Sequence, residues 1–270
     1  MSQPQQYIYG RGSESEYERL VRQGLRYEEE TRTTLQKAGI GQAMRVLDVG
    51  CGVGEVSRIV ADLVGPKGSV VAIDVDPGAL AFARRHLPAA NVEFRCSTID
   101  DFSDPANFDA VVGRFILMHL KNPAAALQKL SSNVRSGGII CFVEPWHGIS
   151  LSHPRVEAFH AFMEGGFQAL RAAGAHLEMG ARLYADFIEA GLPAPQLHTA
   201  AAVSVGDDSE FFELLLESAR SGIRATVPEA QRDSVLAQVE GIGKAMRDEA
   251  VSKRATILLM INVGAWSQKP

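Results

Sequence analysis

Short apolar runs and longer amphipathic runs alternate along the first half of the chain. Five of the runs are rich in β-branched or apolar residues and bounded by Gly, Asp or Pro, as strands buried on both faces are. They span residues 45–50, 69–74, 92–97, 108–113 and 137–145. Apolar positions at helical spacing between them predict helices over 55–65, 77–87 and 123–134. Strands that alternate with helices predict a parallel sheet covered on both faces, with right-handed crossovers.

After Pro145 the alternation gives way to a mainly helical pattern. Helical spacing recurs over residues 153–174, 180–192, 208–222 and 227–250. Apolar runs at 195–206 and 255–266 predict two late strands. A charged, amphipathic run over 13–39 predicts an N-terminal helix that stops at Gly39. The extra helices therefore predict a cap on a single domain rather than a second independent core.

The first predicted strand runs into a glycine-rich turn. The stretch "VLDVGCGVG" (Val46–Gly54) carries three glycines at alternate positions, directly before the helix that begins near Glu55. Such a turn lets bare backbone N–H groups and the positive end of the helix approach a ligand. Glycine-rich turns are also common in doubly wound sheets as simple tight turns. The turn alone is consistent with either role.

An acidic residue follows the next predicted strand. Asp74 ends the run "VVAID" roughly twenty residues past the glycines, where a carboxylate can accept both hydroxyls of a ribose. Its alternative role is to cap the helix that starts at Pro77, but Asp76 is better placed for that. The turn and Asp74 together predict a cofactor that contains a nucleoside.

Three details favour S-adenosylmethionine over a nicotinamide dinucleotide. The glycine spacing is G-x-G-x-G, whereas the pyrophosphate-binding motif is G-x-G-x-x-G. Asp48 stands ahead of the glycines, where it would repel a pyrophosphate but suits a sulfonium and an amino group. The third detail is the pair of strands late in the chain. A dinucleotide-dependent dehydrogenase is therefore the less favoured interpretation of the glycine turn.

Four motifs in order along the chain carry a family resemblance: "VLDVGCGVG", "VVAIDVDP", "FDAVVGRFILMHLKNP" and "SGGIICFVEP". With them, nearly the whole chain resembles class I S-adenosylmethionine-dependent methyltransferases, most of all the small-molecule branch related to ubiquinone-biosynthesis C-methyltransferases. The resemblance implies an α/β, Rossmann-like, doubly wound sheet of seven strands, mostly parallel with a late antiparallel strand. It implies one domain over 1–270, made of an N-terminal helical lid (1–40), a cofactor-binding core (41–146) and helical cap insertions with the last two strands (147–270).

The resemblance also implies which residues bind S-adenosyl-L-methionine and its product S-adenosyl-L-homocysteine. Those expected to line the methionine half are Asp48, Gly50, Cys51 and Gly52. Gly54 is expected to let the next helix pack closely, Asp74 to hold the ribose and Val75 to lie against the adenine. Members of the family usually read the adenine edge with an acidic residue beside a small one. Here Thr98 and Ile99 occupy those positions and Asp100 comes one step later, which leaves the backbone N–H of Ile99 to serve the adenine.

Two further residues carry open alternatives. Arg114 is expected to place its backbone near the sulfonium, with its side chain either paired to Asp48 or the cofactor carboxylate, or in a surface ion pair. His147 follows the fifth strand at the carboxyl edge of the sheet, where an imidazole can take a proton from a substrate. Its alternative is an exposed loop histidine. Glu144 is expected to end the strand and position the adjoining loop.

The remaining histidines and the N-terminal aromatic residues favour structural roles. His119 is expected to satisfy backbone groups at a helix entry, and the other four are expected on the surface or in the core: His153, His160, His176 and His198. Four residues could fold over the cofactor as a lid, although amphipathic packing is the simpler expectation; they are Tyr7, Tyr9, Tyr17 and Gln23.

Composition and charge narrow the class of protein. The 270 residues are 46% hydrophobic with a net charge of −5 and no Lys/Arg-rich run, which disfavours binding along nucleic acid. The polar N-terminus and the absence of a long apolar run predict a cytoplasmic protein without a membrane span. Three scattered cysteines favour reduced thiols, and the absence of CxxC and HExxH patterns gives no metal site.

The predicted function is methyl transfer from S-adenosylmethionine to N, O or C of a small, fairly apolar metabolite by in-line displacement. The methyl group is already activated, so the protein needs mainly to orient the acceptor and exclude water. The alternative is a non-methylating cyclase or isomerase on the same cofactor-binding fold, because fold and cofactor site do not determine chemistry. A purely regulatory binding protein is a third possibility. The predicted partner is a small-molecule methyl acceptor, and the predicted state is a monomer or homodimer.

Overall fold

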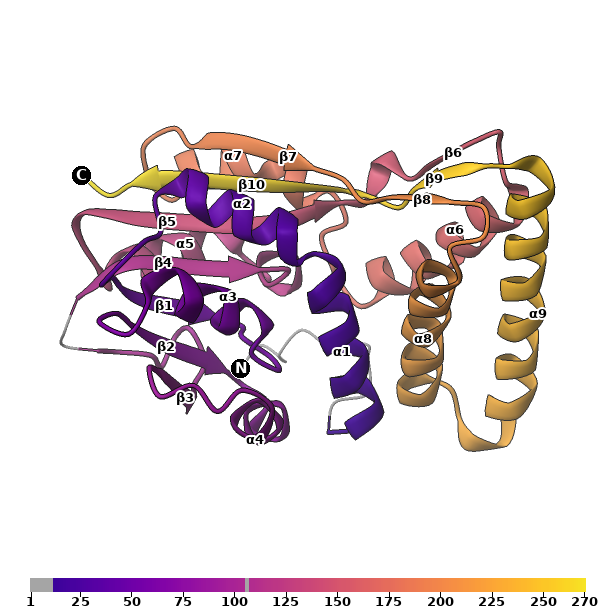
Figure 1. Cartoon of the computed structure of the whole chain (residues 1–270), viewed down its shortest axis with the longest axis horizontal. Coiled ribbons are helices and arrows are strands. Elements are labelled where there is room, and N and C mark those ends of the chain that lie inside the picture. Colours follow the sequence, from indigo (N-terminus) through magenta and orange to yellow (C-terminus); the bar gives the residue numbers. More distant parts are fainter. Residues whose placement is uncertain (1–11, 105–106) are drawn as a thin grey trace.

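A computed structural model describes residues 12–104 and 107–270. A seven-stranded sheet forms the main body, with strand order β3-β2-β1-β4-β5-β10-β7 (Figure 1). Its strands are β1 (Arg45–Val49), β2 (Ser69–Asp74), β3 (Val92–Cys96), β4 (Phe108–Arg114), β5 (Val134–Trp146), β7 (Gln196–Ala200) and β10 (Ile261–Gln268). The first five pair in parallel, whereas β10 is antiparallel to both β5 and β7. The predicted sheet, mostly parallel with a late antiparallel strand, is confirmed.

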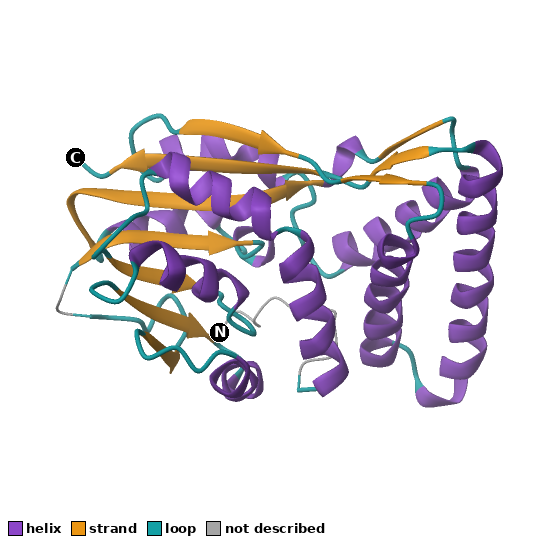
Figure 2. Ribbon diagram, viewed as in Figure 1, coloured by secondary structure: helices purple, strands orange, loops and turns teal. Residues whose placement is uncertain are grey.

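Helices flank both faces of this sheet (Figure 2). Those on one face are α2 (Glu28–Ala38), α3 (Glu55–Val64) and α4 (Pro77–His86); those on the other are α5 (Pro123–Ser131) and α7 (Met179–Glu189). Each face has its own apolar cluster, and neighbouring strand residues alternate between them: Val46 faces the α2–α3 side and Leu47 the α5–α7 side. Burial on both faces explains why the parallel strands are continuous apolar runs in the sequence.

The three strands at the β5 side of the sheet continue into a second, three-stranded sheet. Its strands are β6 (Leu151–His153), β9 (Thr256–Leu258) and β8 (Val203–Val205), in the order β6-β9-β8. β6 follows β5 after the short helix η2 (His147–Ile149), β8 follows β7, and β9 precedes β10. Strands that are neighbours in the main sheet therefore continue into strands that are neighbours in the second sheet. The two predicted late strands, 195–206 and 255–266, are therefore each divided in two. The apolar pattern does not mark the division because both sheets need apolar residues.

Three helices pack on the second sheet to form a lobe around its own apolar cluster. They are α6 (Glu157–Ala172), α8 (Ser209–Thr226) and α9 (Glu229–Lys253). The cluster includes the fully buried rings of Phe159 and Phe211 and the side chain of Ile257. The lobe lies beyond the carboxyl ends of β2 and β4 (Figure 1). This is the edge of an open α/β sheet where ligands bind. The division of 1–270 into lid, core and cap stays a prediction.

The predicted N-terminal helix is divided at Tyr27 into α1 (Glu14–Arg26) and α2. Tyr27 has non-helical dihedral angles and is 3% exposed, and its ring lies edge-on to that of Phe115, with 5.6 Å between the ring centroids. Packing of this ring therefore overrides helix propensity at the break. α1 lies between the main sheet and the lobe (Figure 1), and the buried pair of Arg19 with Glu16 faces Ser218 and Ser221 of α8.

The contact of α2 with β10 depends on Gly264. An added Cβ at Gly264 would lie 2.2 Å from Cγ2 of Thr34. We expect Gly264→Ala to lower the free energy of unfolding by about 1–3 kcal/mol, as overpacking does. Thr34→Ala should restore much of that loss in the double variant. Gly241→Ala is the control, since its Cβ meets open space on α9. Urea unfolding of the unmodified protein, the two single variants, the double variant and the control checks this, and additive effects of the two substitutions would contradict it.

Candidate functional site

The glycine turn connects β1 to α3 at the carboxyl edge of the sheet. Gly50, Gly52 and Gly54 all have positive φ angles, which other residues rarely adopt. The N–H of Gly50 donates to the carbonyl of Ile73 at 2.9 Å. A Cβ at Gly50 would lie 2.6 Å from Cδ1 of Ile116, whereas a Cβ at Gly52 would meet nothing within 4 Å. The backbone of the turn therefore packs against Ile116 at Gly50 and has free space beside it at Gly52.

Asp48 is buried just before this turn, with 1% of its surface exposed. Its Oδ2 accepts a 2.6 Å hydrogen bond from the Ser57 hydroxyl, while Oδ1 is buried without a partner among the described residues. Burial raises the pKa of Asp48 to about 7, and the Arg114 charge acts in the opposite direction. A buried carboxylate oxygen without a donor is suited to a cationic or N–H-bearing ligand.

Asp74 at the end of β2 is tied to the glycine turn. Its Oδ2 accepts from the backbone N–H of Gly52 at 2.8 Å, and its Oδ1 accepts from that of Asp76 at 2.9 Å. Asp76 caps α4 by accepting from the N–H of Gly78, as expected from the sequence. Burial raises the pKa of Asp74. The hydrogen bond between Asp74 and Gly52 could not be predicted from the sequence, because the two residues are 22 positions apart and lie in different loops.

The loops after β2 and β3 adjoin Asp74. Val75 is 47% exposed, and Cys96 at the end of β3 directs its Sγ to the Val75 carbonyl at 3.9 Å. Thr98 is exposed and uses its hydroxyl to bond the backbone N–H and carboxylate of Asp101. Ile99 is half-buried against the core on the α5–α7 side. The sheet thus brings the expected ribose and adenine residues to one edge, and their cofactor roles stay predictions.

Arg114 ends β4 and reaches toward the N-terminal helices. Its Nη1 donates to Thr31 Oγ1 at 2.8 Å and to the Tyr27 carbonyl at 3.5 Å. Among residues 12–104 and 107–270, no carboxylate lies within ion-pair distance of this guanidinium. Burial lowers the pKa of Arg114. The structure shows neither the expected pair with Asp48 nor a surface ion pair, and Arg114 instead joins β4 to α2. A pair with the cofactor carboxylate stays a prediction.

Glu144 near the end of β5 holds the loop that follows β4. Its Oε1 accepts from the backbone N–H groups of Ile116 and Leu117 at 2.9 and 2.8 Å, and its Oε2 from that of Met118 at 3.2 Å. Burial raises the pKa of Glu144 to about 8, against the effect of these three bonds. The expectation that Glu144 positions an adjoining loop agrees with these contacts.

His147 lies where β5 passes into the lobe. β5 continues three residues, roughly 10 Å, past Val143, which pairs with Arg114, and His147 follows. Its half-buried ring contacts Phe167 of α6 edge-on, and Nδ1 lies 3.4 Å from the Leu177 carbonyl. A carbonyl only accepts, so Nδ1 carries the proton and Nε2 is left as the acceptor. Burial lowers the pKa of His147 to about 4.

The sequence of residues 40–191 matches the family model described as a methyltransferase domain. The chain belongs to this methyltransferase domain family. It is 31% identical over 160 residues to a ubiquinone biosynthesis O-methyltransferase of Xanthomonas campestris pv. campestris, covering 58% of this chain and 61% of that one. It is 31% identical over 118 residues to a ubiquinone/menaquinone biosynthesis C-methyltransferase of Ectopseudomonas mendocina, covering 42% and 46%. The matches thus span less than two thirds of these relatives' own lengths.

A solved structure of the same fold comes from Haemonchus contortus. It is an N-methyltransferase in complex with phosphomonomethylethanolamine and S-adenosylhomocysteine. The identity is 17% and the TM-score 0.54, over 90% of this chain and 53% of that chain. The expected resemblance to methyltransferases, including the ubiquinone-biosynthesis C-methyltransferases, is confirmed by these matches and by the family model.

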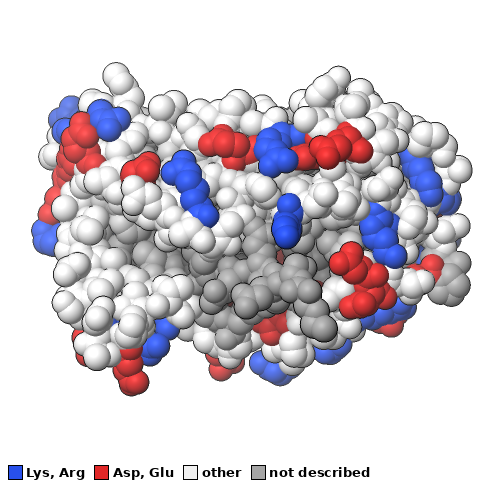
Figure 3. Space-filling view, turned by 180° about the vertical axis from the view of Figure 1, so that it is seen from behind, with Lys and Arg blue, Asp and Glu red and all other residues white. Residues whose placement is uncertain are grey.

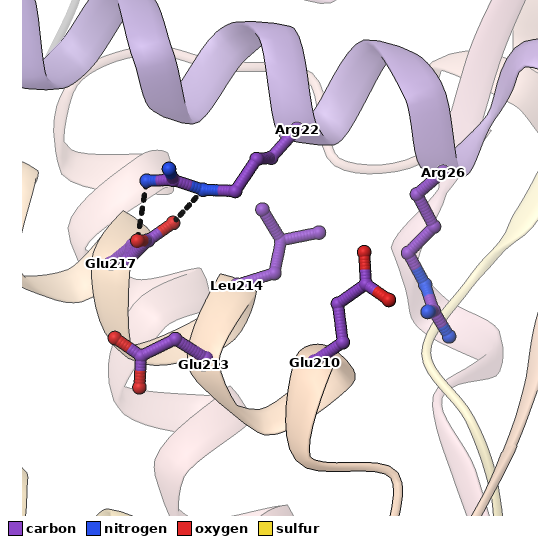
Figure 4. A pocket seen from close by; sticks show the side chains of 6 residues that line it. All are labelled: Arg22, Arg26, Glu210, Glu213, Leu214 and Glu217. Carbon is purple, nitrogen blue, oxygen red and sulfur yellow. Dashed lines mark hydrogen bonds and ion pairs between the residues drawn. The ribbon is translucent and has the colours of Figure 1, made fainter.

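Two surface pockets of this methyltransferase-family chain lie between α1 and α8, away from the glycine turn. The first is lined by Arg22, Arg26, Glu210, Glu213, Leu214 and Glu217 (Figure 4). Arg22 and Glu217 pair across it with two hydrogen bonds. Both signs of charge line it, so it has no strong preference for an ion of either sign.

Three general properties of the methyltransferase-family chain bear on its partners. The face seen in Figure 3 carries interspersed acidic and basic side chains, without a broad basic patch among the described residues. In the same part of the chain, no helix is long and apolar enough to cross a membrane, and no cluster of His, Cys, Asp or Glu suits a metal ion. The cysteines Cys51, Cys96 and Cys141 are free thiols.

The raised pKa of Asp48 predicts a pH-dependent stability. The folded protein favours the neutral form of Asp48. Its contribution to the free energy of unfolding is therefore largest below pH 3.8, the ordinary pKa of the group, and is lost as the pH rises to about 7. Asp48→Asn removes that loss, which is on the order of 3–4 kcal/mol. We expect the variant to gain stability relative to the unmodified protein between pH 4 and 7 in urea unfolding. Asp233→Asn, on the exposed surface of α9, is the control. A constant difference across pH would contradict the assignment.

Proposed function

We infer that the protein transfers a methyl group from S-adenosylmethionine to N, O or C of a small, fairly apolar metabolite. The observation that carries this proposal is the unpartnered Oδ1 of Asp48, buried beside a glycine turn that is open at Gly52. The amino and sulfonium groups of the cofactor would supply the missing positive charge, whereas a pyrophosphate would be repelled. Family membership supports the same reaction.

The residues at the carboxyl edge fit each part of this cofactor. Those that would line the methionine half are Asp48, Gly50, Cys51 and Gly52. Asp74 would accept the ribose hydroxyls with the lone pairs that its two backbone bonds leave. Val75, exposed beside it, would lie against the adenine, with Thr98 and Ile99 next along the edge. When bound, the cofactor supplies a methyl group that is already activated as an electrophile.

The acceptor would enter between this edge and the lobe. The second sheet carries the lobe past the carboxyl ends of the strands, so the lobe lies beyond the edge that holds the expected cofactor residues. An apolar cleft with a few polar groups is the usual site for a small molecule. His147 lies on this side, and its Nε2 is available as a proton acceptor. We therefore assign His147 as the general base for an acceptor that must lose a proton.

The proposal also covers the partner, the oligomeric state and the location of the protein. A small-molecule acceptor, a monomer or homodimer in the cytoplasm, and no nucleic acid partner are consistent with a net charge of −5 and mixed surface charges. No finding favours the alternative cyclase or isomerase. S-adenosylhomocysteine that accumulates in proportion to a converted acceptor would support methyl transfer. Conversion without that product would support the alternative.

Asp74→Ala tests the cofactor site directly. We expect calorimetric titration to show micromolar binding of S-adenosylmethionine and S-adenosylhomocysteine by the unmodified protein, and none of NAD(H). Loss of a charge-assisted ribose contact should weaken the binding by about 1.5–3 kcal/mol, or roughly ten- to 150-fold. Asp74→Asn keeps one acceptor oxygen and should lose less, and Asp233→Ala should lose nothing. Unchanged affinity in a folded Asp74→Ala protein, or binding of NAD(H) alone, would refute the assignment.

His147→Gln tests the proposed base. Because its pKa is lowered to about 4, the imidazole is neutral throughout pH 5–8, and its contribution should be constant there. We expect the single-turnover rate of the variant to fall by about 10²–10⁴-fold at every pH in this range. His198→Gln, on β7, is the control. Equal rates in variant and unmodified protein across pH would remove His147 from the mechanism.

A further inference from the structure

We propose that Glu144 is a positioning residue for methyl transfer. By binding the loop of residues 116–118, it fixes the position of the Ile116 side chain, which packs on the glycine turn. The proposal rests on the proposed function above. Glu144 has no exposed surface, and both of its carboxylate oxygens are used by backbone donors of residues 116–118. Three consecutive N–H groups at the start of a short helix thus converge on one side chain from the neighbouring strand.

The loop held by Glu144 is pressed against the cofactor edge. The side chain of Ile116 occupies the space that a Cβ of Gly50 or of Gly113 would need, at 2.6 and 2.9 Å. The residue before it, Phe115, has a φ of +57° and packs edge-on against Tyr27. A phenylalanine whose backbone lies in the left-handed region is strained, and this conformation persists only where the surrounding structure holds it. Glu144 on one side and the N-terminal helices on the other provide that support.

Glu144 lies near the carboxyl edge of the sheet, close in register to the end of β1 and the glycine turn. Val143, its neighbour, pairs with Arg114, and Gly113 pairs with Val49 just before the glycine turn. Glu144 therefore lies one residue past the level at which β4 ends and two residues past the level at which β1 ends. An apolar side chain here would leave three buried N–H groups without acceptors. A shift of this loop moves Ile116 relative to Gly50, and misplacement by about 1 Å can slow a reaction about a hundredfold.

The test compares Glu144→Ala, Glu144→Gln and Ile116→Ala, alone and with Glu144→Ala. Glu144→Ala should lower kcat about a hundredfold per folded molecule, with little change in affinity for S-adenosylhomocysteine, because Asp74 still binds the ribose. Glu144→Gln keeps an oxygen for the Ile116 and Leu117 N–H groups and should recover most of the rate. If Glu144 acts through Ile116, its loss should add little in the Ile116→Ala background. Asp186→Ala removes another buried acid and should not change kcat per folded molecule.

A kcat within twofold of the unmodified protein in folded Glu144→Ala would overturn the proposal, and so would full additivity with Ile116→Ala. Hydrogen exchange at residues 116–118 provides a readout that does not need turnover: exchange should accelerate in Glu144→Ala and return toward normal in Glu144→Gln. Unchanged exchange would also overturn it. If the unmodified protein binds no S-adenosylmethionine, the proposed function fails. Hydrogen exchange would still show whether Glu144 holds the N–H groups of residues 116–118. If Glu144→Ala does not fold, Ile116→Ala tests the proposal alone: its kcat should fall with little change in affinity for S-adenosylhomocysteine, and an unchanged kcat would overturn the proposal.

Discussion

Several backbone N–H groups of the loops at the carboxyl edge have no acceptor in a helix or in the sheet. Two acidic side chains meet this requirement. Asp74 receives the N–H groups of Gly52 and Asp76, and Glu144 receives those of residues 116–118. Each joins a loop to the end of a neighbouring strand, so the positions of the strands fix the positions of the loops. The shape of the site therefore follows from the register of the parallel sheet.

The lobe depends on the same sheet. Because β6, β9 and β8 continue β5, β10 and β7 in the same order, the lobe is attached through three strand connections rather than one linker. α1 adds a further connection, since Tyr17 donates to Asp76 at the carboxyl edge of the main sheet while Arg19 contacts Ser218 in the lobe. Of the lid residues expected from the sequence, Tyr17 and Gln23 lie in this helix, and Tyr7 and Tyr9 lie outside the described residues.

Much of the core could be predicted because its residues follow local rules. The strand at 69–74, the cap at Asp76 and the glycine turn before Glu55 each depend on near neighbours, and the structure places them as expected. Contacts between distant segments were beyond the sequence. The break at Tyr27 depends on Phe115, and the division of the late strands depends on partners in a second sheet. The packing of Ile116 on Gly50 is of the same kind.

Charge then distinguishes the two acids that flank the glycine turn. Asp74 has donors for both oxygens, so it organises the turn whether or not a ligand is bound. Asp48 has a donor for only one, and burial raises its pKa to about 7, so ionising it is costly in the protein alone. A cation beside Oδ1 would remove that cost by stabilising the carboxylate. The edge therefore combines a preorganised turn with one charge left to be matched, and the sulfonium cofactor of the proposed function would match it.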